Sequence, residues 1–279
     1  PVDELPNGFT GFSNLQSSQN MNYQYSRSHG TDRKNGVEPL TKEKMEAIGP
    51  KDRRWSWVEV DRAAIQHNVT QTRRLLGSST RLMAVVKADA YGHGAIQVAK
   101  TAVASGASYL GVATVDEGIE LREAGFREPI LILSEPPIQA VPLLLFYNIM
   151  PSVYTPDFAI VYAEIADAHG KKAPYHLAIN TGMNRIGVRH DDVMEFLSQI
   201  SFHRALELQG CFTHFATADS PETLDFQIQI KRFVETMRAM ETAGIDPGIV
   251  HCDNSAALYR FPKTHFDMVR LGIAMYGYQ

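Results

Sequence analysis

The chain has 279 residues, 44% of them hydrophobic, and a formal net charge of −4. This length suits one large globular domain, since an α/β barrel typically needs about 250 residues. The charge is not gathered into blocks, so neither nucleic acid nor a membrane surface is expected as a partner. The sequence has no apolar run of the ~18 residues that a membrane helix requires, and no signal-peptide pattern.

The two cysteines, Cys211 and Cys252, both fall in apolar runs. Neither has the neighbours of a metal site, and free cysteine is among the most buried residue types. We therefore expect two reduced core cysteines and no metal site, in a reducing compartment such as the cytoplasm.

Residues 1–50 are poor in apolar side chains and rich in Asn, Ser, Gln and Gly. Such a segment buries too little surface to offset the entropy of ordering it, so we predict a mobile, disordered extension with at most a short helix at 42–48. The rest of the chain, residues 51–279, is expected to form one folded domain. Its first element is an alternating segment, 57–61, which predicts a leading strand, and a helical pattern follows to Leu76.

Short apolar runs and helical stretches then alternate along the rest of the chain. The runs lie at 82–88, 109–113, 130–133, 149–153, 175–180, 208–215, 249–251 and 266–271. The stretches between them carry apolar side chains at a 3.6-residue period, which is typical of helices packed on a core. The two clearest examples are Phe158, Val161, Tyr162 and Ile165, and then Phe226, Ile230, Phe233, Met237 and Met240.

Eight strands alternating with helices predict an α/β fold, a closed (β/α)8 TIM-like barrel with parallel strands. An open doubly wound sheet is the alternative, but its glycine-rich phosphate-binding fingerprint is absent. The leading strand at 57–61 is then a ninth strand with no place in the barrel. We expect it to pair with something outside, such as a second domain.

Lys87 is the most informative residue at the strand ends, where barrel enzymes place their active sites. It follows the apolar run Ala84-Val85-Val86. Burial lowers the pKa of a lysine and makes its amine a nucleophile towards carbonyl groups. A lysine at a strand end can also extend into solvent, and position alone does not separate the two readings.

Other polar side chains end the later strands. Asn254 and Ser255 precede a helical stretch after the seventh run, and Gly272 follows the eighth. In barrels these two loops often bind phosphate, although the same pair of residues also serves as a plain helix cap. A buried lysine together with a phosphate cradle favours a phosphorylated aldehyde, pyridoxal 5'-phosphate, as cofactor.

Five segments, in chain order, closely resemble the alanine racemase family of fold-type III pyridoxal-phosphate enzymes, and the resemblance covers residues 55 to 277. They are 85–94 (Val-Val-Lys-Ala-Asp-Ala-Tyr-Gly-His-Gly), 180–187 (Asn-Thr-Gly-Met-Asn-Arg-Ile-Gly), 213–216 (Thr-His-Phe-Ala), His251 with 254–257 (Asn-Ser-Ala-Ala), and 269–277 (Val-Arg-Leu-Gly-Ile-Ala-Met-Tyr-Gly).

The resemblance implies a role for each matching residue. Lys87 would form the Schiff base and act on one face of the substrate Cα, Tyr91 would contact the phosphate, and His214 would lie against the pyridine ring. Arg270 would face the pyridine nitrogen and keep it unprotonated, because two positive charges repel. The resemblance also implies a set of phosphate-binding residues, Ser255, Asn254, Gly272 and Ile273. Arg185 would approach the cofactor's phenolic oxygen and the substrate.

The implied function is interconversion of L- and D-alanine by abstraction of the Cα proton, which supplies D-alanine for cell-wall peptidoglycan. Family members are homodimers, and their C-terminal β domain supplies a catalytic tyrosine to the neighbouring subunit. We expect that domain to be absent from a chain that stops at Gln279, and the leading strand to belong with it. On this expectation the chain as given is poorly active.

One residue departs from the family pattern. Where family members commonly carry a lysine that buttresses the Arg185 position, this chain has Ala178. We predict that a chloride ion or a water network, helped by Asn180, takes its place. An alanine there also occurs in broad-specificity relatives, so serine or lysine are alternative substrates.

Two other readings of the barrel remain open at the sequence level. A non-enzymatic barrel protein of pyridoxal-phosphate homeostasis would explain the length, but its lysine motif differs from the one at 85–94. A decarboxylase of the same fold usually places an acidic residue at the pyridine nitrogen, and Arg270 argues against it.

Overall fold

The computed structural model describes residues 41–53 and 55–278. The chain divides into two compact units between Val60 and Asp61. The first unit contains helix α1 (Lys42–Glu46), which begins where the Thr41 side chain accepts the Lys44 backbone N–H, and one 3-10 turn, η1 (Pro50–Arg53). This confirms the short helix predicted at 42–48. The mobile extension predicted for 1–50 falls, over residues 1–40, outside the described residues.

The leading strand predicted at 57–61 does not form in the described residues. Residues 57–60 have neither helical nor strand hydrogen bonding, and no strand pairing in the described residues includes them. Asp61 instead caps helix α2 (Arg62–Leu75), with its carboxylate accepting the backbone N–H groups of Ala63 and Ala64. A strand requires a hydrogen-bonded neighbour, which the alternation of side chains cannot supply.

The second unit is a barrel of eight parallel strands. They are β1 (Arg81–Val85), β2 (Tyr109–Val112), β3 (Ile130–Ile132), β4 (Met150–Val153), β5 (Ala173–Asn180), β7 (Leu206–Phe212), β8 (Ile249–His251) and β9 (Met268–Leu271). Their order is β8-β7-β5-β4-β3-β2-β1-β9. A two-residue strand, β6 (Val188–Arg189), pairs with β5 and was not predicted.

The barrel closes between β8 and β9. The backbone N–H of Asp267 donates to the Val250 carbonyl at 3.1 Å, and that of Arg270 donates to the Asp253 carbonyl at 3.1 Å. This confirms the predicted barrel and excludes the open doubly wound sheet, whose edge strands do not meet.

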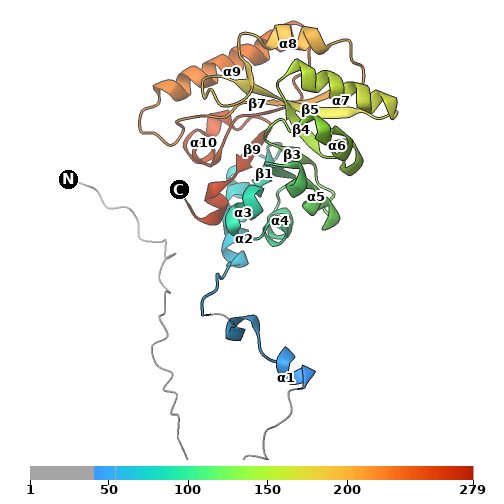
Figure 1. Cartoon of the computed structure of the whole chain (residues 1–279). Coiled ribbons are helices and arrows are strands. Elements are labelled where there is room, and N and C mark those ends of the chain that lie inside the picture. Colours follow the sequence, from blue (N-terminus) through green and yellow to red (C-terminus); the bar gives the residue numbers. More distant parts are fainter. Residues whose placement is uncertain (1–40, 54, 279) are drawn as a thin grey trace, which may run out of the picture. The chain divides into compact units, whose positions relative to one another are not determined.

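The helices of this unit lie outside its strands (Figure 1). They are α2 with α3 (Lys87–Gly92), α4 (Ala95–Ala104), α5 (Val115–Glu123), α6 (Val141–Tyr147), α7 (Pro156–Ala168), α8 (Val193–Ile200), α9 (Leu224–Thr242) and α10 (Ser255–Arg260), and the 3-10 turns η2 (Ile138–Ala140), η3 (Pro262–Thr264) and η4 (Ile273–Tyr276). The two predicted apolar stripes are confirmed, since Phe158 and Tyr162 of α7 and Phe233 and Met240 of α9 are all buried. Among the described residues, every helix is too short or too polar to cross a membrane.

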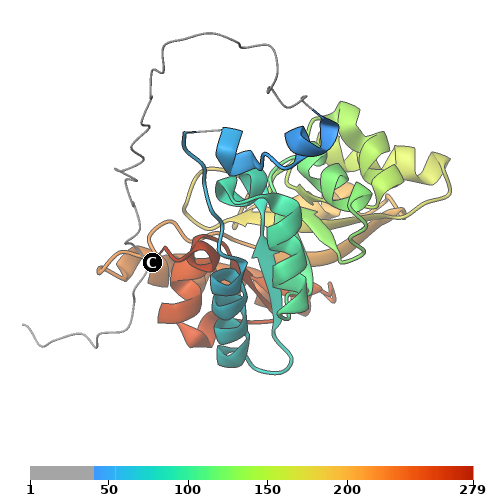
Figure 2. The same cartoon turned by 90° about the horizontal axis from the view of Figure 1, so that it is seen from below.

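Helix α2 completes the ring of helices although it precedes the first strand. Among the described residues strand β9 is followed by η4, and α2 packs against that turn (Figure 2). The Asn68 side-chain amide donates to the Met275 carbonyl at 3.1 Å, and the hydroxyls of Thr72 and Tyr259 lie 2.7 Å apart. These contacts tie the first helix of the barrel to η4, after the last strand, and to α10, before it.

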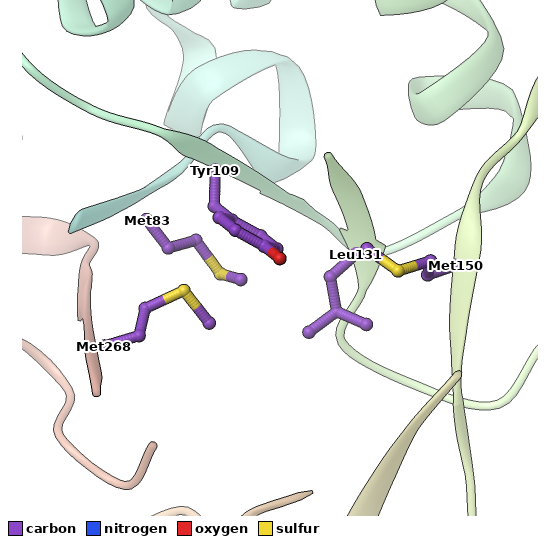
Figure 3. Packing of buried hydrophobic residues seen from close by; sticks show 5 residues of the cluster. All are labelled: Met83, Tyr109, Leu131, Met150 and Met268. Carbon is purple, nitrogen blue, oxygen red and sulfur yellow. The ribbon is translucent and has the colours of Figure 1, made fainter. Parts of the chain in front are cut away.

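The N-terminal half of the barrel interior is filled by large side chains. Figure 3 shows Met83, Tyr109, Leu131, Met150 and Met268 pointing toward one another inside the strands. Each such burial stabilises the fold by roughly 1.5–3 kcal/mol. These side chains fill the interior at this end, and the predicted site residues lie towards the opposite mouth.

Candidate active site

A left-handed turn positions Lys87. Strand β1 ends at Val85, earlier than the predicted 82–88, because the chain turns sharply at Lys87. The four residues from Ala88 to Tyr91 all have φ between 50° and 56°. A left-handed conformation costs about 1–2 kcal/mol per non-glycine residue, so it persists only where its surroundings hold it. Here Ala90 is completely buried inside the turn.

The Lys87 amine lies in a mixed electrostatic environment. It is half-buried, and its Nζ lies 6.0 Å from the centre of the Tyr91 ring. Burial lowers the pKa of Lys87, the Arg185 charge lowers it further, and the Glu117 charge raises it. A larger share of neutral amine at a given pH makes this lysine a better nucleophile and base than an exposed one.

Glu117 was missed by the sequence analysis. Its carboxylate accepts the backbone N–H groups of Ala88 and Ala113, both at 2.7 Å, and so joins the end of β2 to the Lys87 turn. A signal was present, because Thr114 and Glu117 have the spacing of a capping box, which the structure contains. That signal predicts the start of α5 but not the contact with Ala88.

Three predicted phosphate-binding residues converge at the end of β9. The Ser255 hydroxyl accepts the backbone N–H groups of Gly272 at 3.0 Å and Ala274 at 3.2 Å. A Cβ atom at position 272 would lie 3.3 Å from the Tyr91 hydroxyl and 3.8 Å from the Ser255 hydroxyl. Two hydroxyl groups and a bare stretch of backbone thus form one polar cradle. Ile273 lies next in the chain and is 48% exposed.

Asn254 stands beside this cradle, but its side chain is engaged within the fold. It caps α10 by accepting the Ala257 backbone N–H at 3.0 Å, and its amide donates to the Phe215 carbonyl at 3.3 Å. The plain helix cap considered at the sequence level is therefore present, and a direct contact with phosphate stays a prediction.

Arg270 is buried at the centre of the mouth. Its guanidinium donates to the carbonyls of Thr213 at 2.8 Å and Cys252 at 2.9 Å, to Nδ1 of His251 at 2.8 Å, and to Nδ1 of His214 at 3.4 Å. Burial lowers the pKa of Arg270 to about 10. The guanidinium remains a cation at neutral pH and is oriented by partners from β7, β8 and their loops.

The contacts of Arg270 set the tautomers of two buried histidines behind it. Arginine only donates, so Nδ1 of His251 accepts and its proton is on Nε2, which donates to Nδ1 of His176 at 2.9 Å. Burial and the Arg270 charge lower the pKa of His176 to about 3 and that of His251 well below its usual value. The outer nitrogen of His176, Nε2, has no hydrogen-bond partner among the described residues. The sequence analysis gave His176 no role.

His214 is a neutral ring at the same mouth. Burial lowers its pKa to about 3, and the charges of Arg270, Arg185 and Lys87 act in the same direction. Three cations around one imidazole keep it unprotonated, so that it presents a flat neutral face.

Arg185 lies on the loop after β5 and is exposed. Asn180 holds that loop, because its side-chain oxygen accepts the backbone N–H groups of Gly182 and Asn184, both at 3.0 Å. A pocket opens between this loop and β7. Its lining includes Ala178, Asn180, Arg185 and His214. Over the described residues, no carboxylate forms an ion pair with Arg185.

Comparison with known proteins decides the family. A family model described as the N-terminal domain of alanine racemase matches residues 60–279. This chain belongs to the alanine racemase family.

Individual alanine racemases are similar over the same region. The one from Nostoc sp. is 42% identical over 226 residues, which is 80% of this chain and 58% of that protein. The crystal structure of alanine racemase from Bacillus anthracis with bound L-Ala-P matches with a TM-score of 0.77 at 39% identity, covering 81% of this chain and 58% of that one. The Clostridium difficile alanine racemase in complex with cycloserine matches with a TM-score of 0.76 at 35% identity, covering 78% and 60%. The chain thus spans 58–60% of the length of these relatives.

The alanine racemase barrel of this chain gathers most of the predicted site at one mouth. Lys87 and Tyr91 follow β1, and the neighbouring strand β9 contains Arg270 and ends just before Gly272. His214 and Ser255 lie shortly after β7 and β8. Arg185 reaches the same mouth by its loop, since its charge acts on both Lys87 and His214.

Proposed function

We propose that this chain is the cofactor-binding barrel of an alanine racemase, an isomerase that interconverts L- and D-alanine with pyridoxal 5'-phosphate. One observation carries the proposal. A lysine amine with a lowered pKa shares one barrel mouth with a cradle of two hydroxyls and a glycine backbone. The expected role of the product is the supply of D-alanine for cell-wall peptidoglycan.

The residues of the mouth fit this cofactor. A phosphate group would be held by the hydroxyls of Tyr91 and Ser255 and by the backbone at Gly272 and Ile273, where a side chain at position 272 would crowd the cradle. When bound, the cofactor supplies an aldehyde that condenses with amines and an aromatic ring that withdraws electrons from the substrate Cα.

Arg270 and His214 are assigned to the ring. The charged guanidinium of Arg270 disfavours a second positive charge nearby, so we expect it to keep a facing pyridine nitrogen unprotonated. A ring without that charge withdraws electrons less strongly, which limits side reactions such as transamination. The flat neutral face of His214 supports an aromatic ring without adding a charge.

Lys87 is assigned the proton transfer at Cα. Burial and the Arg185 charge favour its neutral amine, which can accept a proton from one face of the substrate and return it. Racemisation requires a second acid–base group on the opposite face. We propose that a neighbouring subunit of a homodimer supplies it, as the family resemblance implies. The two buried, reduced cysteines fit a protein of the cytoplasm.

The pocket beside Ala178 supports a small anion as the partner of Arg185. The family's buttressing lysine is replaced by alanine, and the space between Arg185, Asn180 and His214 remains open. We propose that a chloride ion or an ordered water occupies it. A bromide-soaked crystal separates the two, because bromide scatters anomalously: anomalous density beside Arg185 indicates the anion, and its absence indicates the water.

Ala178 favours a second candidate, a racemase that also accepts serine or lysine, because the family resemblance links an alanine there to broad-specificity relatives. The pocket adjoins Arg185, which is assigned to the substrate side of the cofactor. Comparing kcat/KM for L-alanine, L-serine and L-lysine separates the candidates. A preference for alanine of about a hundredfold supports the narrow function, and comparable values support the broad one.

Racemisation of L-alanine, followed by chiral chromatography in the presence of pyridoxal 5'-phosphate, tests the function itself. We expect the full-length protein to form D-alanine and its Lys87→Ala variant to form none. A Lys87→Ala variant that retains the activity contradicts the assignment of Lys87.

A further inference from the structure

Glu117 uses its two carboxylate oxygens for different purposes. Oε2 accepts the backbone N–H groups of Ala113 at 2.7 Å and Thr114 at 3.4 Å, while the Thr114 hydroxyl accepts the Glu117 N–H. This is a capping box at the start of α5, and it needs only one oxygen. Oε1 is free of that task and accepts the Ala88 N–H at 2.7 Å.

The bond to Ala88 acts directly on the reactive lysine. The Ala88 N–H belongs to the planar peptide unit that also carries the Lys87 carbonyl. Holding this N–H fixes the peptide plane and hence the direction in which the Lys87 side chain leaves the backbone. Hydrogen bonds to a carboxylate are shorter and stronger than those between neutral groups.

The turn that follows Lys87 requires such support. Ala88 is the first of four consecutive residues with left-handed backbone. A second carboxylate ties the turn to the next helix, because the Asp89 side chain accepts the N–H of Ala95, the first residue of α4, at 2.7 Å. Two carboxylates therefore brace a conformation that isolated L-residues avoid.

Glu117 also acts on Lys87 through its charge. Arg185 is the nearby cation that disfavours the charged amine, and Glu117 is the carboxylate that favours it. Without Glu117, burial and Arg185 would act on Lys87 unopposed.

We propose that Glu117 is a positioning residue for Lys87, which clamps the left-handed turn by its bond to Ala88 and balances the charge of Arg185. The inference rests on the proposed function, in which Lys87 is the reacting amine.

The Glu117→Gln variant tests both parts. Glutamine is of similar size but neutral, and it has one acceptor oxygen, so its NH₂ group must face one of the two N–H donors. Competitive acylation of the Lys87 amine across a pH series, read by peptide mass spectrometry without cofactor, reports its pKa. We expect the midpoint to move to lower pH, because the favourable negative charge is gone. Affinity for pyridoxal 5'-phosphate is expected to fall about tenfold, the size of one lost charged hydrogen bond.

Glu120→Gln is the matched control, since it removes the same charge from an exposed position on the same helix. It should leave both the Lys87 midpoint and the cofactor affinity unchanged. A Glu117→Gln variant that folds, by circular dichroism, and matches Glu120→Gln in both measurements overturns the proposal and leaves Glu117 as a helix cap.

Amide hydrogen exchange in the unaltered protein tests the clamp without any variant. Ala88 is exposed, and an exposed amide without a partner exchanges rapidly. We expect slow exchange at Ala88, and rapid exchange there contradicts the clamp even if Glu117→Gln fails to fold. This measurement needs no cofactor, so its outcome is independent of whether Lys87 is the reacting amine.

Discussion

The two halves of the barrel interior are built from the same strands and differ in almost every other respect. At the strand beginnings, large side chains such as Met150 and Met268 fill the space and leave the interior closed. At the strand ends, a buried arginine, neutral histidines and a left-handed turn surround an open mouth. The first half stabilises the fold. The second half holds a buried charge and left-handed backbone, both of which a folded chain normally avoids.

The unusual features of the mouth are each held by several neighbours. Arg270 donates to carbonyls just after two strands, and two carboxylates hold the Lys87 turn. Strain and buried charge persist only where the surroundings over-determine them. The comparison therefore predicts that mutations in the mouth change both stability and cofactor binding, whereas those in the closed half change stability alone.

The largest effect is expected from Arg270→Leu. It leaves the buried carbonyls of Thr213 and Cys252 without their donor, and each buried unsatisfied acceptor costs about 1–3 kcal/mol. We expect urea unfolding to show a loss of about 4 kcal/mol together with loss of cofactor binding. Arg189→Leu is the control, because Arg189 pairs with Asp191 on the surface and should change stability by less than about 1 kcal/mol.

Leu131→Ala probes the closed half. Leu131 is completely buried, so its truncation should cost about 3 kcal/mol in the free energy of unfolding. Cofactor affinity, measured by titration at a temperature where the variant is folded, should stay within about twofold. A large loss of affinity would show that the two halves are not separable.

Acidification tests the neutral histidines. The pKa of His176 is lowered from 6.5 to about 3 in the folded chain, so the unfolded chain binds this proton more readily. The stabilisation is fully present above pH 6.5 and is lost as the pH falls towards 3, at about 1.4 kcal/mol per pH unit. Urea unfolding at pH 6.5 and 5.5 measures the pH dependence, and His176→Phe should reduce the difference in stability between the two by about 1 kcal/mol. An unchanged pH dependence contradicts a neutral buried His176.

The smallest effect is expected from Gly272→Ala. The backbone at Gly272 has φ of −108° and ψ of −109°, outside the α and β regions that L-residues favour, so alanine there should cost about 1 kcal/mol of stability. The new Cβ would lie 3.3 Å from the Tyr91 hydroxyl and narrow the cradle. Affinity for pyridoxal 5'-phosphate should fall by about tenfold, measured by fluorescence titration, while an unchanged affinity argues against a phosphate at this place.

The barrel could be predicted because each strand is a short apolar run between periodic helices, a pattern that burial alone imposes. At the mouth, place along the chain indicated Lys87, Ser255 and Gly272, whereas the roles of Arg270 and His214 came from the family resemblance. The left-handed turn could not be predicted, because alanines do not favour that backbone and the bonds that hold it come from distant residues such as Glu117. His176 lies in an apolar run and reads as a core position until its partner His251 is seen. The prediction of a strand at 57–61 was wrong for a similar reason, because side-chain alternation does not show whether a pairing partner is present.

The central claim is that Lys87 is the residue that binds the cofactor's aldehyde. Reduction of the protein with borohydride in the presence of pyridoxal 5'-phosphate, followed by peptide mapping, fixes the cofactor on the lysine that holds it. The account predicts one modified peptide, carrying the label on Lys87. Labelling of other lysines such as Lys171 or Lys172 with Lys87 unmodified would contradict it.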